Sequence, residues 1–295
     1  MDSKFICNLY TPGEANVIVF GVPLGKDSKK ALRSLREASD FVEIFDPDKR
    51  KNLLDDIRIH DIGNIKLKKL KEITKMVEEI ISLRKIPLIL GGGHLLTLFS
   101  LKAFDNIKLI VFDAHADLKE EYEDKRIREL NLANGIKFHR KINDATWLRR
   151  ACEFINPENI LLLGLRSCDE DEFEFIKNNK ILYFTSNQIK DNIEKVKEIL
   201  SQFTRDSKVY LSIDVDVFDP SIAPAVHHPE PNGIYLREFS ELIDSIKGEV
   251  GGMDFVCLKH EKNRDQRTQF LIVRACLEVL GTVSLNRNLK NIKFN

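Results

Sequence analysis

Ile107-Lys-Leu-Ile-Val-Phe-Asp-Ala-His-Ala-Asp117 joins a mostly apolar, β-branched run to three polar residues that alternate with alanine. The run lacks the alternation of a half-exposed strand, so it predicts a strand that is covered on both faces. Such strands belong to parallel sheets with helices on each side. The polar residues then stand at the carboxyl end of the strand, which is where open parallel sheets place their ligands.

Two further blocks repeat this order of an apolar run followed by polar residues. Pro87-Leu-Ile-Leu-Gly-Gly-Gly-His94 ends in an imidazole, and Val209-Tyr-Leu-Ser-Ile-Asp-Val-Asp216 ends in two carboxylates. The glycine triplet permits a tight, unusual backbone path. Side chains two residues apart share a face of a strand. We therefore expect the polar side chains of residues 113–117 to point one way if strand pairing continues through them.

Strands and helices alternate along the whole chain. Besides the three runs above, strands are predicted at residues 15–23, 57–62, 159–165, 181–184 and 253–258. Helices are predicted at residues 67–83, from 94 onward, and at 145–155, 169–178, 190–203, 235–247 and 267–281. The sequence contains no repeat, low-complexity stretch or linker, so residues 1–295 are expected to form a single α/β/α domain.

Composition narrows the class of protein. Lys+Arg and Asp+Glu balance at 46 each, which gives no reason to expect nucleic acid or an anionic membrane as partner. The five cysteines are scattered and form no Cys-x-x-Cys pair, as is usual for reduced thiols in the cytoplasm. The first residues lack a secretory signal, and no apolar run is long enough for a bilayer. We expect a soluble, cytoplasmic protein.

The three blocks together offer two imidazoles and four carboxylates as metal ligands: His94, Asp113, His115, Asp117, Asp214 and Asp216. An oxygen-rich set without thiolate suits Mn²⁺ best, with Zn²⁺, Co²⁺ or Fe²⁺ as substitutes. Two ions roughly 3.5–4 Å apart can acidify a water enough to supply hydroxide near neutral pH. A lone Asp-x-His more often forms a strand-end turn. Three blocks at three predicted strand ends favour a metal-dependent hydrolase.

These motifs resemble the ureohydrolase family, which includes arginase, agmatinase and formiminoglutamase, and they are most like agmatinase. Gly-Gly-Gly-His94, Asp-Ala-His-Ala-Asp117 and Ser-Ile-Asp-Val-Asp-Val-Phe-Asp-Pro220 match its three most diagnostic motifs. The similarity covers most of the chain. It implies a three-layer α/β/α sandwich with a central, mostly parallel sheet, two Mn²⁺ per subunit, and a homotrimer or homohexamer.

The resemblance also implies roles for the ligands. It assigns one ion to His94, Asp113, Asp117 and Asp214, and the other to His115, Asp113, Asp214 and Asp216, so that Asp113 and Asp214 bridge. Hydroxide would attack a guanidinium carbon to give urea and an amine, with Asp117 as the proton shuttle. Asp117, His115 and Asp144 are the expected catalytic residues. Agmatine plus water to putrescine and urea is the reaction we expect first.

Candidate substrate-binding positions depart from the family pattern. Family members that act on guanidino groups place a glutamate where this chain has Cys257, and a neutral thiol cannot make charged, bidentate hydrogen bonds. Asp144 stands where agmatinases have a histidine, and Val226-His227-His228 replaces Thr-Gly-Thr. The N-terminal Gly- and Arg-rich loop is shortened to about residues 26–34. Asp144, His227, His228 and Cys257 are therefore the expected substrate-binding residues.

Several alternatives stay open at this point. Either Asp144 supplies the lost carboxylate for a guanidino or amidino substrate, or the metal site serves another substrate: formiminoglutamate, arginine, a guanidino acid or an amide-like compound. A metal-containing binding protein without turnover is a third possibility, and a one-zinc, deacetylase-like site fits poorly. Cys257 is equally well explained as a packed core thiol. The charged insertion of residues 119–141, with Tyr122 and His139, is either a substrate loop or a solvated surface segment.

Overall fold

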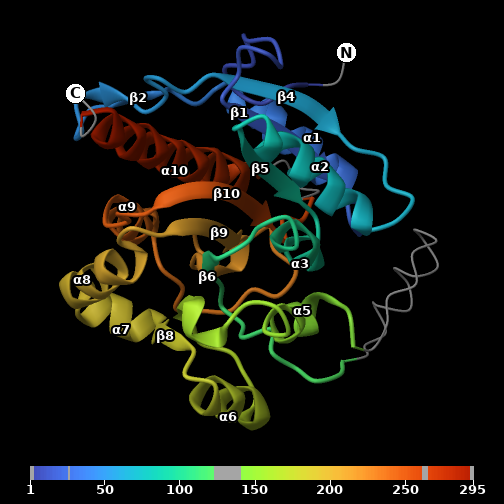
Figure 1. The fold of residues 1–295 in the computed structure, drawn as a ribbon, viewed down its shortest axis with the longest axis vertical. Coiled ribbons are helices and arrows are strands. Elements are labelled where there is room, and N and C mark those ends of the chain that lie inside the picture. The colour runs from blue at the N-terminus through green and yellow to red at the C-terminus, as the bar shows by residue number, and fades with distance from the viewer. Residues whose placement is uncertain (1–2, 26, 123–140, 261–264, 293–295) are drawn as a thin grey trace.

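One large parallel sheet organises the molecule (Figure 1). The computed structural model describes residues 3–25, 27–122, 141–260 and 265–292, with side chains of the last helix given as far as Val283. Eight strands follow the order β4-β1-β5-β10-β9-β6-β7-β8, and every neighbouring pair is parallel. They are β1 (Val17–Val22), β4 (Ile59–Asn64), β5 (Ile86–Gly91), β6 (Ile107–Phe112), β7 (Ile160–Leu165), β8 (Leu182–Thr185), β9 (Lys208–Asp214) and β10 (Glu249–Val256). A separate antiparallel pair is formed by β2 (Phe45–Asp46) and β3 (Lys51–Asn52).

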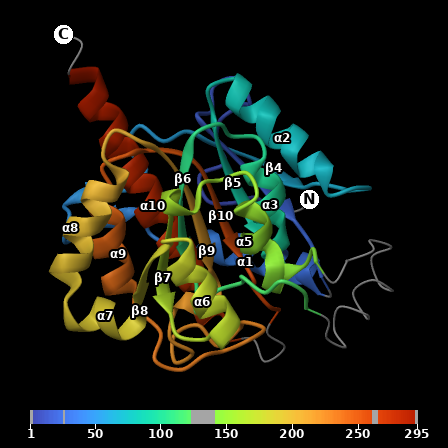
Figure 2. The same ribbon diagram turned by 60° about the horizontal axis from the view of Figure 1, so that its bottom comes forward.

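Helices cover both faces of the sheet, so the predicted three-layer α/β/α sandwich is confirmed (Figure 2). One layer holds α1 (Ser28–Ser39), α7 (Ser186–Asp191), α8 (Ile193–Thr204), α9 (Leu236–Asp244) and α10 (Arg267–Ile292). The other layer holds α2 (Lys71–Ser82), α3 (Leu95–Leu101), α5 (Trp147–Ala151) and α6 (Glu170–Asn178). Short 3-10 turns lie at Asp144–Thr146, Pro157–Asn159 and Val215–Val217. Within the described ranges, none of the helices has the length and apolar character needed to cross a membrane.

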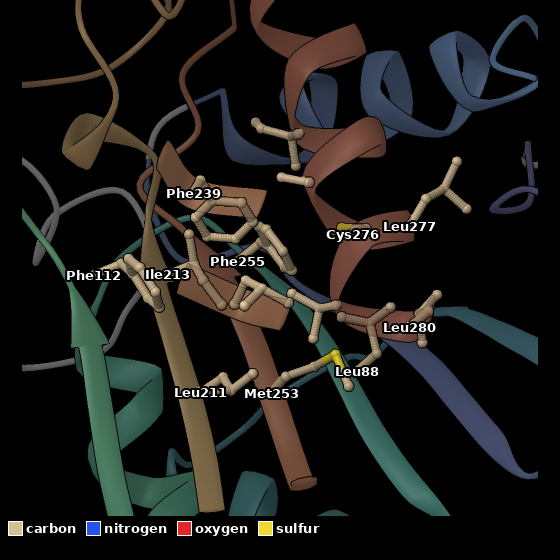
Figure 3. Close-up of a cluster of buried hydrophobic side chains, with 14 of the residues drawn as sticks. Leu88, Phe112, Leu211, Ile213, Phe239, Met253, Phe255, Cys276, Leu277 and Leu280 are labelled. Atoms are coloured by element: carbon tan, nitrogen blue, oxygen red, sulfur yellow. The ribbon is translucent and has the colours of Figure 1, made fainter. Parts of the chain in front are cut away.

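Alternate residues of the central strands pack against different layers. Leu211 and Ile213 of β9 and Met253 and Phe255 of β10 lie in one cluster with Leu277 of α10 (Figure 3). Full burial of each such side chain stabilises the fold by about 1.5–3 kcal/mol. The residues between them face α3 on the opposite side of the sheet, and several of these are polar. The sheet therefore carries an apolar face and, beneath α3, a partly polar one.

Most predicted elements are present, and the exceptions have local causes. The structure corrects the shortened loop expected at about residues 26–34, because α1 begins at Ser28 and buries Ala31, Leu32 and Leu35 beneath a charged outer face. The helix predicted at 190–203 is two helices, α7 and α8, because the chain bends at Asn192, whose side chain caps α8.

Candidate metal centre

The three motifs meet at one edge of the sheet. They follow the carboxyl ends of β5, β6 and β9. Strand β10 lies between β5 and β9, so Cys257, which follows its carboxyl end, lies at the same edge. Parallel strands bring their carboxyl ends to one edge whatever the sequence distance between them. Strand order therefore brings residues 94 and 216 together.

The segment after β6 does not continue as a strand. Pairing stops at Phe112, His115 makes only an isolated bridge to Ser167, and Asp117 has a left-handed backbone with φ 51°. The condition under which residues 113, 115 and 117 would share one strand face, continued strand pairing, is therefore not met. The chain turns instead. As a result His115 faces Asp216, whereas Asp113 and Asp117 face His94.

His94 faces three carboxylates. Its Nδ1 lies 3.1 Å from Asp113 Oδ2, 3.2 Å from Asp117 Oδ2 and 3.2 Å from Asp214 Oδ2. The imidazole is fully buried and stacks obliquely on the ring of Trp147, whose Nε1 also donates to Asp117 Oδ2 at 2.8 Å. Trp147 is itself fully buried and lies against both His94 and Asp117.

A second cluster adjoins the first through Asp113. His115 Nδ1 lies 3.1 Å from Asp216 Oδ2 and 3.6 Å from Asp113 Oδ1. The two oxygens of Asp113 thus face the two imidazoles, as a bridging carboxylate would require. The short imidazole contact of Asp214 is to His94, and its other oxygen accepts from Asp216 N at 2.9 Å. Its bridging role stays a prediction.

The ligand atoms of the two clusters are suited to divalent cations. His94 Nδ1 and Asp113 Oδ2 are buried and, among the described residues, make no well-aligned hydrogen bond. Unpartnered polar atoms in the interior carry a free-energy penalty, and clustered carboxylates repel one another. Ligand atoms lie within 4.8 Å of one another in three groups: His94/Asp113/Asp117, Asp113/His115/Asp216 and His94/Asp214/Cys257. Two divalent ions would balance four carboxylates and satisfy both atoms.

Burial and mutual contact shift the pKa values of the groups in this centre. Burial, reinforced by the charge of Asp113, raises the pKa of Asp117 to about 7 and also raises that of Asp216. Although burial alone would lower it, hydrogen bonding to Asp113 and Asp216 raises the pKa of His115 to about 12. Ions that bind here must displace protons from these groups.

A chain of buried hydrogen bonds supports His94 on the side of the ring that faces away from the carboxylates. Its Nε2 lies 3.0 Å from Ser212 Oγ, and Ser212 donates to Asp254 Oδ1 at 2.7 Å. Asp254 Oδ2 accepts from Thr97 Oγ1 at 2.8 Å and from Tyr210 OH at 2.7 Å. Because Ser212 gives its proton to Asp254, Nε2 of His94 carries the hydrogen and Nδ1 is left as the ligand atom.

Sequence reasoning missed this chain of hydrogen bonds. Its signal is Asp254, a fully buried acid within the otherwise apolar residues 250–256 of strand β10. A carboxylate at such a position requires several partners. The partners themselves come from α3 and β9 and are identifiable only once the strand order is known.

Asp144 lies beside the His94 segment. Its Oδ1 accepts from Leu95 N at 2.8 Å, and its side chain is exposed. A Cβ on Gly93 would stand only 2.9 Å from that oxygen, so glycine is needed for the close approach. The backbone of the glycine triplet is not left-handed, but its path is tight, since a Cβ on Gly91 or Gly92 would stand 2.1 Å or 1.9 Å from a neighbouring atom. Asp144 is thus positioned at the rim of the centre, within reach of solvent.

The two histidines before Pro229 lie at the opposite rim. The ring of His228 packs edge-on against His115, with centroids 5.9 Å apart, and both His227 and His228 are exposed. An antiparallel bridge between Val226 and Leu258 sets this loop beside the exit of β10. The bridge therefore places the loop of His227 and His228 beside Cys257, while their contacts with substrate stay a prediction.

Cys257 occupies the exit of β10 in a left-handed conformation with φ 64°. Its N donates to Gly92 O at 3.0 Å, and its side chain is half-buried. Burial, then the charges of Asp214 and Asp144, raise the pKa of the Cys257 thiol well above its usual value. The thiol therefore borders the carboxylates of the centre rather than packing in a purely apolar core.

Two features complete the rim. Glu230 Oε1 lies 3.6 Å from His115 Nε2, and Arg166 fixes this loop by donating to the carbonyl oxygens of Glu230 and Asp216. Of the insertion, Tyr122 accepts a hydrogen bond from Asn143 through its carbonyl, at the base of the Asp144 turn. His139 lies outside the described residues.

Comparison with known proteins agrees with the motifs. The model of the Arginase family matches residues 15–281. Agmatinase from Bacillus cereus is 30% identical over 249 residues, 79% of this chain and 78% of that protein. N(1)-aminopropylagmatine ureohydrolase from Thermococcus kodakarensis is 30% identical over 278 residues, 87% of each chain. The crystal structure of agmatine ureohydrolase from Thermoplasma volcanium superimposes with a TM-score of 0.80 at 26% identity, covering 96% of this chain and 94% of that one. The chain therefore belongs to the arginase family of ureohydrolases and is most like its agmatinases.

Proposed function

We propose that this protein is a two-metal hydrolase of guanidino or amidino C–N bonds, with agmatine as substrate and putrescine and urea as products. One observation carries the proposal: four carboxylates converge on two imidazoles, and the Nδ1 of His94 is buried without a well-aligned hydrogen bond. Family membership and the agmatinase relatives supply the reaction class. We propose Mn²⁺ as the ion because the six expected ligands are oxygen-rich and include imidazole.

The side chains of the site have different roles in this proposal. Ions held by the six ligands would supply a hydroxide nucleophile near neutral pH. Asp117 is the most accessible of the four ligand carboxylates, with 14% of its side chain exposed against 2–5% for the others. It is therefore the carboxylate best placed to pass a proton to the leaving nitrogen.

Acidic groups at the rim favour a cationic substrate. Asp144 is exposed on the His94 side, and Glu230 is 34% exposed on the His115 side. Agmatine carries a positive charge at each end, so both acids can contribute to its binding. In this proposal Asp144 provides the carboxylate for the guanidinium that Cys257 cannot provide.

Cys257 is also the observation that favours a second candidate. A neutral thiol beside the centre would accept a less strongly charged group, such as a formimino or amide-like carbon. The second candidate is therefore the same hydrolytic site acting on formiminoglutamate or a related compound.

The test is release of urea or formamide from the Mn²⁺-loaded chain with agmatine, arginine, guanidinobutyrate and formiminoglutamate. Urea from agmatine supports the first candidate, and formamide together with glutamate from formiminoglutamate supports the second. Asp144→Asn should raise KM for agmatine, whereas Asp169→Asn, another exposed acid that begins a helix, is the matched control. Two bound ions with no turnover on any compound would refute an enzymatic function and leave a metal-binding protein.

We further propose a homotrimer or homohexamer located in the cytoplasm. Light scattering coupled to gel filtration measures the assembly, and a stable monomer would contradict it. Fractionation of the source cells tests the location.

A further inference from the structure

We propose that Cys257 is an additional ligand, through its sulfur, of the metal ion that binds at His94. This inference rests on the two-ion centre proposed above. His94, Asp214 and Cys257 each offer one ligand atom, and the three atoms lie within 4.8 Å of one another. None of the six ligands expected from the sequence contains sulfur, so the proposal changes the character of the site.

The backbone holds Cys257 in register with His94. Its N donates to the carbonyl of Gly92, two residues before His94, and its φ of 64° is one that non-glycine residues seldom adopt. Gly92 is itself closely packed, since a Cβ there would stand 1.9 Å from Leu24 O. Strained conformations of this kind persist where the surrounding structure fixes them, often at binding sites.

His94 independently marks a cation position beside the thiol. Its Nδ1 is fully buried, makes no well-aligned hydrogen bond and faces carboxylate oxygens at 3.1–3.2 Å. The Ser212 contact at Nε2 directs the lone pair of Nδ1 toward those oxygens. Only a proton or a metal ion relieves this arrangement, and the same imidazole belongs to the group that contains Cys257.

The distances permit coordination after a small movement. With bonds of about 2.3 Å to sulfur and about 2.1 Å to nitrogen, two ligands at the tetrahedral angle of one zinc-sized ion lie about 3.6 Å apart. The ligand atoms lie within 4.8 Å of one another, so a closure of at most about 1.2 Å is required. Coordination releases the thiol proton to solvent, as it does for other cysteine ligands.

Sulfur coordination would have two consequences. Four carboxylates balance two divalent ions, so a thiolate adds one negative charge, which a cationic substrate can neutralise. The charge of the missing glutamate is then kept on the ion, in addition to the exposed carboxylate of Asp144. A soft ligand also moves the preference of this position from Mn²⁺ toward Zn²⁺, Fe²⁺ or Co²⁺.

The experiment uses the full chain loaded with Co²⁺, whose bonds to thiolate give an intense near-ultraviolet charge-transfer absorption. The spectrum is compared among wild type, Cys257→Ser and Cys7→Ser, with bound ions counted by elemental analysis. Cys7 is the matched control because it is also half-buried and left-handed, with φ 55°, and it packs in a different part of the core. X-ray absorption of the Zn²⁺-loaded wild type adds a measurement that needs no variant.

We expect the band in wild type and Cys7→Ser and its loss in Cys257→Ser, with a sulfur neighbour about 2.3 Å from zinc. Affinity for Co²⁺ should fall by at least about tenfold in Cys257→Ser, the lower end of what even partners of metal ligands contribute. Ions bound in wild type without sulfur absorption or a sulfur neighbour would overturn this inference alone, whatever the variant does. Absence of bound ions in wild type would overturn the two-ion centre as well.

Discussion

Replacing Ser212 with alanine should weaken the binding of one metal ion and leave the affinity for the other unchanged. Ser212 is fully buried and links His94 Nε2, at 3.0 Å, to Asp254 Oδ1, at 2.7 Å. Without its hydroxyl, the Nε2–H of His94 has no acceptor and Asp254 loses one of its three hydroxyl donors. The ligand imidazole then loses its fixed tautomer and orientation.

The size of the effect follows from the partners that remain. Losing the outer partner of a ligating histidine typically lowers metal affinity 10–100-fold, which is about 1.4–2.7 kcal/mol. Leaving a buried N–H unsatisfied also lowers the free energy of unfolding of the ion-free protein by about 1–3 kcal/mol. The ion at His115 should keep its affinity, because its contacts with Asp113 and Asp216 do not involve Ser212.

The assay is calorimetric titration of Mn²⁺ into wild type, Ser212→Ala and Ser100→Ala. Ser100 is the matched control: it is fully buried on α3 and hydrogen-bonds to Tyr210 OH at 2.8 Å, three hydrogen bonds further from His94 than Ser212 is. Both variants should lose stability, but only Ser212→Ala should lose affinity at one site. Equal affinities in the two variants would refute the role assigned to the chain of buried hydrogen bonds.

Four further outcomes follow from the same contacts. His115→Ala should lose one ion, measured by elemental analysis, and nearly all turnover; full activity would refute the metal assignment. Affinity for Mn²⁺ should rise between about pH 6 and about pH 8, because the raised pKa of Asp117, about 7, means that ions compete with its proton below that value; a flat calorimetric profile would contradict this. Arg36→Ala should lower the free energy of unfolding by about 3–5 kcal/mol in chemical denaturation without changing ion stoichiometry, because it leaves the buried Asp61 unpaired. Asp144→Asn should raise KM for agmatine more than it lowers kcat, and steady-state kinetics showing unchanged KM would assign Asp144 to capping α3 alone.

The fold was predictable where burial is two-sided. Runs such as residues 107–112 and 209–213 are apolar because both faces of a central strand are covered, and that pattern needs no knowledge of neighbours. The ligands could be identified for a related reason, since polar residues directly after such runs fall at one edge of a parallel sheet. α1 was missed because its apolar residues are few and lie between charged ones.

Contacts that depend on strand order could not be predicted. In the sequence, nothing connects Thr97, Ser212 and Asp254, and only Asp254 stands out, as an acid within a strand. They form one chain of hydrogen bonds because β10 pairs with β9 beneath α3. The turn at Asp117 was also missed, because alternation with alanine is equally compatible with a strand and with the left-handed turn that forms. Secondary-structure propensity gives no information on which side chains from other elements lie at the end of a strand.

The position of β10 decides the chemistry of the centre. Had β5 paired directly with β9, the six expected ligands would still follow neighbouring strand ends, but Cys257 would lie elsewhere. Because β10 is inserted between β5 and β9, its exit falls beside His94 and Asp214, and the residue there must contribute to the centre as a charge, a ligand or a barrier. A thiol has no bidentate hydrogen bonds to offer a guanidinium, but it can bind a metal ion directly. The substitution that weakens the agmatinase pattern is therefore the one that gives this site a chemistry of its own.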